Sequence, residues 1–98
     1  MSMSAISLSG MQASMVRMTA SASNVANVAS QGNQPVRAVL SDVAGGGVSA
    51  RIEASGAAEV DLTDQMVEML VAKIAFQANA KMLATAHDLE RGLVDRLA

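Results

Sequence analysis

The sequence predicts a mainly α-helical chain: two long terminal helices, paired as in a coiled coil, with a small β-hairpin or irregular segment between them. Near both ends of the chain, apolar residues recur at alternating steps of three and four, which is the period of helices packed side by side. The middle has short alternating runs and a glycine cluster instead. The length of 98 residues suits one small domain spanning residues 1–98.

The N-terminal helix is expected over residues 4–30. Arg17 is the only charged residue among the first 36, whereas a solvent-facing helix usually carries Lys and Glu. We therefore expect its polar side to contact protein as well, with small residues allowing neighbouring helices to approach closely: Ala13, Ser14, Ala20, Ser21 and Ala22. Its apolar row consists of Leu8, Met11, Met15, Met18, Ala22, Val25 and Ala29.

Residues 31–58 predict a Gly-rich loop and a β-hairpin, or a flexible segment that becomes a hairpin on assembly. Gly32 and Pro35 are typical of a helix stop. Two short runs, 36–43 and 48–52, flank a turn containing three consecutive glycines. An isolated hairpin is marginally stable, so we expect it to depend on its neighbours.

The C-terminal helix is expected over residues 61–97, with Asp61 as its N-cap. Two apolar rows run along it and make a stripe too broad for one partner helix to cover. The first row is Leu62, Met66, Met69, Lys73, Phe76, Ala80, Leu83 and His87. The second is Val67, Leu70, Val71, Ile74, Ala78, Met82, Ala86, Leu89 and Leu93. Phe76, the only aromatic residue, is expected to anchor a core within its own chain or with a neighbour.

Composition argues against several classes of function. A net charge of −2 gives no basic footprint for nucleic acid. Without cysteine and with a single histidine, there is no candidate nucleophile–base pair or metal-ligand spacing. We therefore expect no enzymatic activity, no catalytic residue, no cofactor, no metal and no small-molecule substrate. The N-terminus lacks the charged and apolar regions of a cleaved signal peptide.

Motifs at both ends resemble the bacterial flagellar axial proteins, the family of rod, hook and hook-associated subunits. At the N-terminus the resemblance rests on residues 8–13 (LSGMQA) and 22–28 (ASNVANV), followed by Gly32. At the C-terminus it rests on residues 60–62 (VDL), 66–67 (MV), 75–81 (AFQANAK) and 85–86 (TA). The short middle is most similar to small basal-body rod proteins, because hook and distal-rod members carry larger insertions.

This resemblance implies a structural subunit of the flagellar basal-body rod, which polymerises through its terminal helices into a hollow torque-transmitting shaft. Its partners would be copies of itself, other flagellar axial proteins and the flagellar export apparatus, through which it would leave the cytoplasm without a cleaved signal peptide for the periplasm-spanning rod. In isolation a homo-oligomer is expected. The assembly interface is predicted to include Leu8, Met11, Met15, Met18, Asn24, Val25, Asn27, Leu62, Met66, Met69, Leu70, Ile74, Phe76, Gln77, Asn79 and Leu83.

Two alternatives remain open at the level of sequence. One is a generic helical oligomerisation module without a flagellar role. The other is a peripheral membrane-binding amphipathic protein, against which the scarcity of Lys and Arg on the first helix counts.

Overall fold

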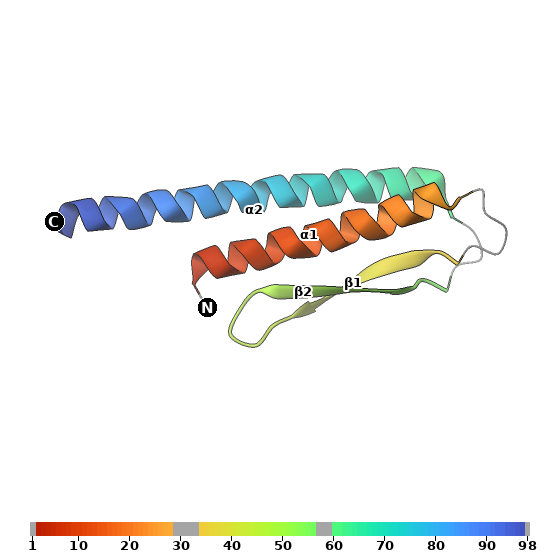
Figure 1. Ribbon diagram of the computed structural model, residues 1–98, viewed down its shortest axis with the longest axis horizontal. Helices are drawn as coiled ribbons and strands as arrows, with labels where there is room; N and C mark the ends of the chain where they lie inside the picture. Colours follow the sequence, from red (N-terminus) through yellow and green to blue (C-terminus); the bar gives the residue numbers. More distant parts are fainter. Residues whose placement is uncertain (1, 29–33, 57–59, 98) are drawn as a thin grey trace.

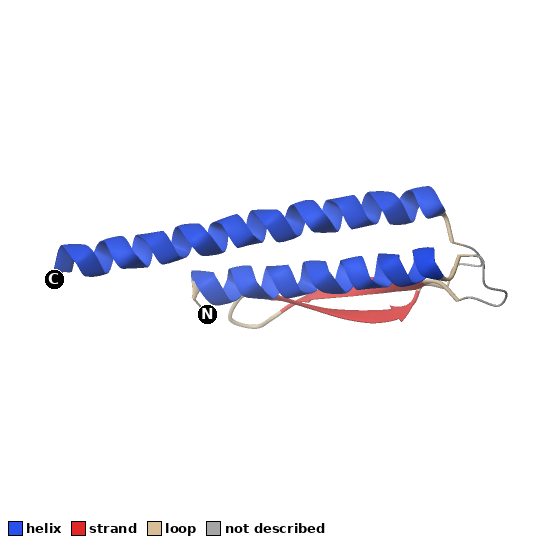
Figure 2. Cartoon of the chain, turned by 45° about the horizontal axis from the view of Figure 1, so that its top comes forward, coloured by secondary structure: helices blue, strands red, loops and turns tan. Residues whose placement is uncertain are grey.

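Two antiparallel helices and one hairpin lie side by side, with the first helix between the other two elements (Figures 1 and 2). The computed structural model describes residues 2–28, 34–56 and 60–97. The elements are α1 (Met3–Ala26), β1 (Val36–Asp42), β2 (Val48–Ala54) and α2 (Leu62–Leu97). Both helices and the intervening hairpin agree with the predicted fold class.

Helix α1 ends four residues before its predicted end. Asn27 occupies the C-cap with φ −106° and ψ 10°, and its backbone N–H still donates to the Ser23 carbonyl. Its side-chain Nδ2 donates to the same carbonyl at 2.8 Å. The helical hydrogen bonds therefore run up to Asn27, and the helix ends there because the Asn27 backbone leaves helical geometry. Residues 29 and 30, included in the predicted helix, and residues 31–33 of the predicted turn lie outside the described residues.

Helix α2 begins as predicted from its N-cap. The Asp61 Oδ1 atom accepts hydrogen bonds from the backbone N–H groups of Thr63 at 3.0 Å and Asp64 at 3.3 Å. Backbone N–H groups in the first turn of an α-helix have no acceptor within the helix, and Asp61 supplies one.

The hairpin presents one apolar face and one polar face. Its antiparallel register pairs Ala38 with Ile52 and Leu40 with Ala50. On the polar face, Arg37 forms an ion pair with Glu53 across the strands at 3.0 Å. The turn requires glycine, because Gly45, Gly46 and Gly47 all adopt positive φ between 89° and 108°. The hairpin contacts α1, whereas the described parts of the hairpin and α2 share no packing contact.

The packing between the elements is made by small side chains. The buried positions on the helices are Ser7, Ala13, Ser14, Ala20, Ser21 and Asn24 of α1 and Ala72 and Ala86 of α2. Among the described residues, every Leu, Ile, Met, Val and Phe side chain stays partly or fully exposed. Four of the five small residues predicted to allow close approach are therefore buried, and Ala22 is exposed.

Gly10 marks the closest approach of the two helices. A Cβ atom added there would lie 2.7 Å from Nδ2 and from Oδ1 of Asn79. Replacing glycine by alanine in an isolated helix stabilises that helix by about 1 kcal/mol. Here the clash reverses the sign, and we expect Gly10→Ala to lower the free energy of unfolding by about 1–2 kcal/mol in a urea titration. Adding Asn79→Ala is expected to recover most of that loss, and a Gly10→Ala chain more stable than the wild type would contradict this packing.

Candidate assembly surface

Each helix presents a row of small or polar residues to the other, and we call these the inner rows. On α1 the inner row is Ser7, Gly10, Ser14, Arg17, Ser21 and Asn24; on α2 it is Gln65, Glu68, Ala72, Ala75, Asn79 and Ala86. Three pairs of residues fix the alignment of the two rows. They are Gly10 against Asn79, Arg17 Nε to Glu68 Oε1 at 2.7 Å, and Asn24 Nδ2 to Gln65 Oε1 at 3.0 Å. The polar pairs set the register of a contact that has no large apolar side chain to set it.

Asn24 joins three elements through one buried amide. Its Nδ2 donates to the Val36 carbonyl at 2.7 Å as well as to Gln65 on α2. Its Oδ1 accepts from the Val36 backbone N–H at 2.8 Å. The residue is 3% exposed. Its amide is thus engaged within its own chain, and it ties α1 to both β1 and α2.

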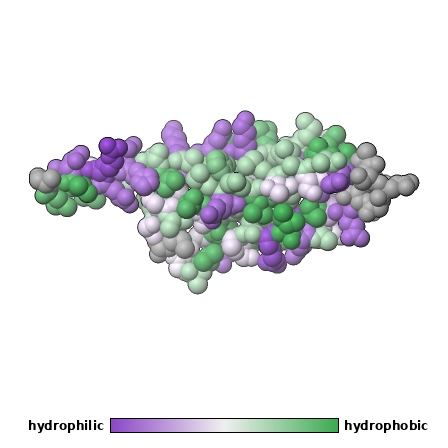
Figure 3. Space-filling view, in the orientation of Figure 1, coloured by the Kyte–Doolittle hydropathy of each residue, from purple (hydrophilic) through white to green (hydrophobic). Residues whose placement is uncertain are grey.

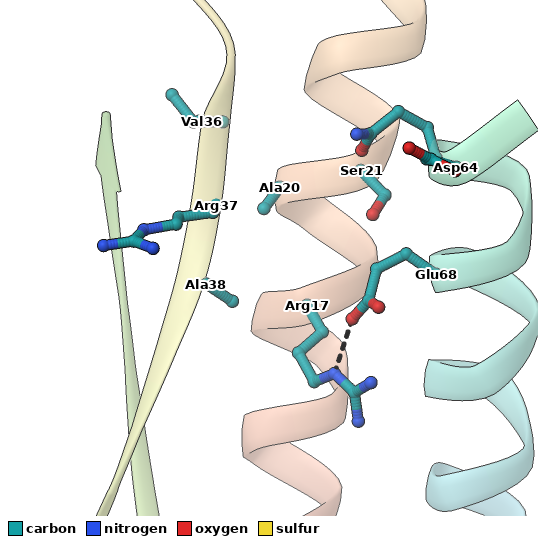
Figure 4. A pocket seen from close by; sticks show the side chains of 9 residues that line it. Arg17, Ala20, Ser21, Val36, Arg37, Ala38, Asp64 and Glu68 are labelled. Carbon is teal, nitrogen blue, oxygen red and sulfur yellow. Dashed lines mark hydrogen bonds and ion pairs between the residues drawn. The ribbon is translucent and has the colours of Figure 1, made fainter. Parts of the chain in front are cut away.

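The flank of the helix pair that faces the hairpin is polar. A trough of about 290 Å³ lies there, between α1, β1 and the first turns of α2. Figure 4 shows Arg17 and Glu68 joined by their ion pair along it, with Asp64 above them and Ala20 facing β1. The Arg37 side chain points toward β2 and away from the trough. The acidic and basic groups here largely compensate one another.

The opposite flank is apolar, and we call it the methionine face. It is formed by Leu8, Met11, Met15, Met18, Ala22 and Val25 of α1 and Leu62, Met66, Met69, Lys73, Phe76, Ala80 and Leu83 of α2. On each helix, the residues of this face follow the inner-row positions by one residue in the sequence. They therefore lie on the side of the helix away from Ala20 and Asp64, which line the trough. Both rows therefore border the same edge of the helix contact. Met11, Met18, Met69, Phe76 and Leu83 are half-buried along that edge.

The outer part of the methionine face is open to solvent. Leu8, Met15 and Met66 are 47%, 54% and 62% exposed. Lys73 is the only charged residue among its members. A strip of this length with a single charge, formed by two helices, is typical of a surface that contacts protein.

The structure brings most of the predicted interface residues together on this face. Leu8, Met11, Met15, Met18, Val25, Leu62, Met66, Met69, Phe76 and Leu83 belong to it. Leu70, Ile74 and Gln77 are exposed on other sides of α2. Asn24 and Asn79 lie in the inner rows, and Asn27 caps α1.

The sequence analysis expected Ser14 and Ser21 to allow close approach, but it missed that the inner rows are the packing seam between the two helices. It read the large apolar rows as the packing seams of both helices, although Ser7, Ser14 and Ser21 recur every seven residues. So do Gln65, Ala72, Asn79 and Ala86. The heptad spacing of these residues was the available signal, but the larger side chains of the neighbouring methionine rows have the same periodicity.

Other kinds of site have little support in the described parts of the chain. Within residues 2–28, 34–56 and 60–97, no group of three or more acidic or histidine side chains is placed to hold a metal ion. Neither described helix combines the length and apolarity needed to cross a membrane.

The arrangement defines a class of protein: a structural subunit whose terminal helices pair through small residues and leave a methionine-rich face uncovered. Comparison with known families identifies that class more closely. Residues 50–95 match the family model described as flagellar basal body rod FlgEFG protein C-terminal. A search of curated proteins finds no match.

This match includes nearly all of α2 and supports a protein of the flagellar rod and hook family. The match also supports a structural role on the flagellar axis and a place in the basal body, because the family is one of structural components and not of enzymes.

Proposed function

We propose that this protein is a subunit of the basal-body rod that polymerises through its methionine face into a hollow shaft. Copies of itself and other flagellar axial proteins are the proposed neighbours. The flagellar export apparatus is the proposed route from the cytoplasm, without a cleaved signal peptide. The exposure of the methionine face is the observation that carries the proposal.

The balance of buried and exposed residues supports this function. Alanines and serines bury little area, so the contact between α1 and α2 stabilises the free chain weakly. Leu8, Met15 and Met66 are about half exposed or more, and burying such a side chain fully contributes about 1.5–3 kcal/mol. Much of the available apolar stabilisation is therefore released only when another molecule covers the face, which couples ordering to assembly.

Methionine suits a surface with several different neighbours. Its flexible thioether side chain adapts to irregular contacts. Subunits in a shaft repeat one heterologous contact that does not close, and this generates a filament. Neighbours at the two ends of such a shaft would differ in sequence, so an adaptable face is an advantage.

Deletion of the gene in its own host tests the proposal, scored by swimming and by electron microscopy of purified basal bodies. We expect non-motile cells with truncated rods or missing hooks, and restoration by the wild-type gene. The step at which assembly stops would locate the subunit along the rod. Normal swimming with intact basal bodies would reject the rod function and favour a generic helical oligomer.

A further inference from the structure

The C-terminal end of α2 extends beyond α1 and is exposed. Gly10 lies against Asn79 in the antiparallel pair, so Met3, the first residue of α1, lies opposite Ala86. Ala86 is 4% exposed, and every described residue after it is exposed. Residues 87–97, which we call the overhang, project about 16 Å past the start of α1. Figures 1 and 2 show this projection beside the N-terminus, and the space-filling view in Figure 3 shows hydrophobic and hydrophilic residues on it.

The overhang continues the inner row of α2 with larger apolar side chains. Leu89 and Leu93 follow Ala86 on that side of the helix and are 59% and 61% exposed. A hollow of about 320 Å³ at Gly92 is lined by Asp88, Leu89, Gly92, Leu93 and Arg96. Positions 89, 92, 93 and 96 have the i, i+3, i+4, i+7 spacing of the four-residue hole that receives a knob in helix packing.

We propose that the overhang docks antiparallel on the overhang of a second copy, with Leu93 of each chain in the hollow at Gly92 of the other. The site is continuous with the contact between α1 and α2, which stops at Met3, where α1 begins. Centred on Leu93, the alignment places Leu97 of one chain beside Leu89 of the other. The second copy thus covers the side of the overhang that would lie against α1 if α1 were longer.

Charge complementarity selects the antiparallel direction. In this alignment Arg96 of one chain lies within one turn of Asp88 of the other, and both residues line the hollow at Gly92. In a parallel pair in register, each charge would instead meet its own kind. Helix dipoles add to the preference, because the negative end of one α2 points at the positive end of the other α1. The first turn of α1 has no acidic residue that would already compensate that end.

This inference concerns the free subunit and goes beyond the proposed rod function. Subunits of a polar shaft all point in one direction, so a two-fold antiparallel dimer must open before assembly. The contact is smaller than a standard stable interface, and we expect a dissociation constant on the order of 0.1 mM or weaker. The methionine face remains free in this dimer.

Cysteine cross-linking of the full chain tests the docking, because the natural sequence contains no cysteine. At about 1 mM protein, we expect a disulfide between Leu89→Cys and Leu97→Cys chains when the two are mixed, and none when either is oxidised alone. Leu93→Cys, at the two-fold axis, is expected to link to itself. Self-linking of Leu89→Cys, or no link in the mixture, would overturn the proposal.

Gly92→Leu fills the proposed hollow without disturbing the monomer, since nothing lies within 4 Å of a Cβ atom built there. We expect its dissociation constant in sedimentation equilibrium to rise about tenfold or more, with circular dichroism showing equal or greater helix content. Ala84→Leu, which adds similar bulk at an exposed position of α2 outside the overhang, is the matched control and should dimerise like the wild type. Unchanged dimerisation of Gly92→Leu would refute the docking.

Discussion

Met15→Glu is expected to abolish rod assembly while leaving the subunit folded. Met15 is 54% exposed, so a carboxylate there costs the monomer little. In an assembled shaft the same carboxylate would be buried against apolar neighbours without a partner, which costs several kcal/mol at every contact. We expect loss of swimming in a soft-agar assay of the complemented deletion strain, with wild-type amounts of soluble protein.

Thr85→Glu is the matched control. Thr85 is also exposed on a helix but lies outside the methionine face. Thr85→Glu adds the same charge as Met15→Glu, and we expect the strain that carries it to swim normally. Full motility of Met15→Glu would show that this face does not become buried in the rod.

Asn24→Ala is expected to have the largest effect on stability. It removes three hydrogen bonds and leaves the N–H and C=O groups of Val36 without their side-chain partner. Each such part-buried group costs about 1–3 kcal/mol, so the free energy of unfolding should fall by about 2–4 kcal/mol in a urea titration. For a chain of this size such a loss is a large fraction of the total stability.

Asn27→Ala is the control that separates the role of the three Asn24 hydrogen bonds from a general loss of asparagine. Asn27 is exposed, and among the described contacts its side chain bonds only to the Ser23 carbonyl in its own helix, so we expect a loss of about 0.5–1 kcal/mol. Hydrogen exchange of the β1 amides should speed up strongly in Asn24→Ala and little in Asn27→Ala. Equal stability of the two variants would contradict the role of Asn24 in holding α1, β1 and α2 together.

The sequence predicted the elements better than the contacts between them. Alternating apolar steps located both helices, and Asp61 marked the start of α2 because capping is a local property. The early end of α1 escaped prediction because the apolar row continues to Ala29. The helix ends at Asn27 by a local change of backbone conformation, and periodicity does not report that.

The partner of each helical row could not be read from periodicity. Two rows with the same spacing lie one residue apart on each helix, and large side chains marked one of them as the packing seam. Close packing of the chain selected the other row, because Ser14, Ser21 and Ala72 allow the backbones to approach. Asn24 was predicted at an interface, but its long-range bonds to Val36 and Gln65 depend on tertiary geometry.

Accessibility of a single cysteine tests the central claim most directly. Met15→Cys places the only thiol of the chain on the methionine face, and a maleimide reagent measures its reactivity in the free subunit and in purified basal bodies. The account predicts rapid labelling of the free subunit and strong protection in the rod. Equal labelling in both would mean that the methionine face stays exposed after assembly and would contradict the account.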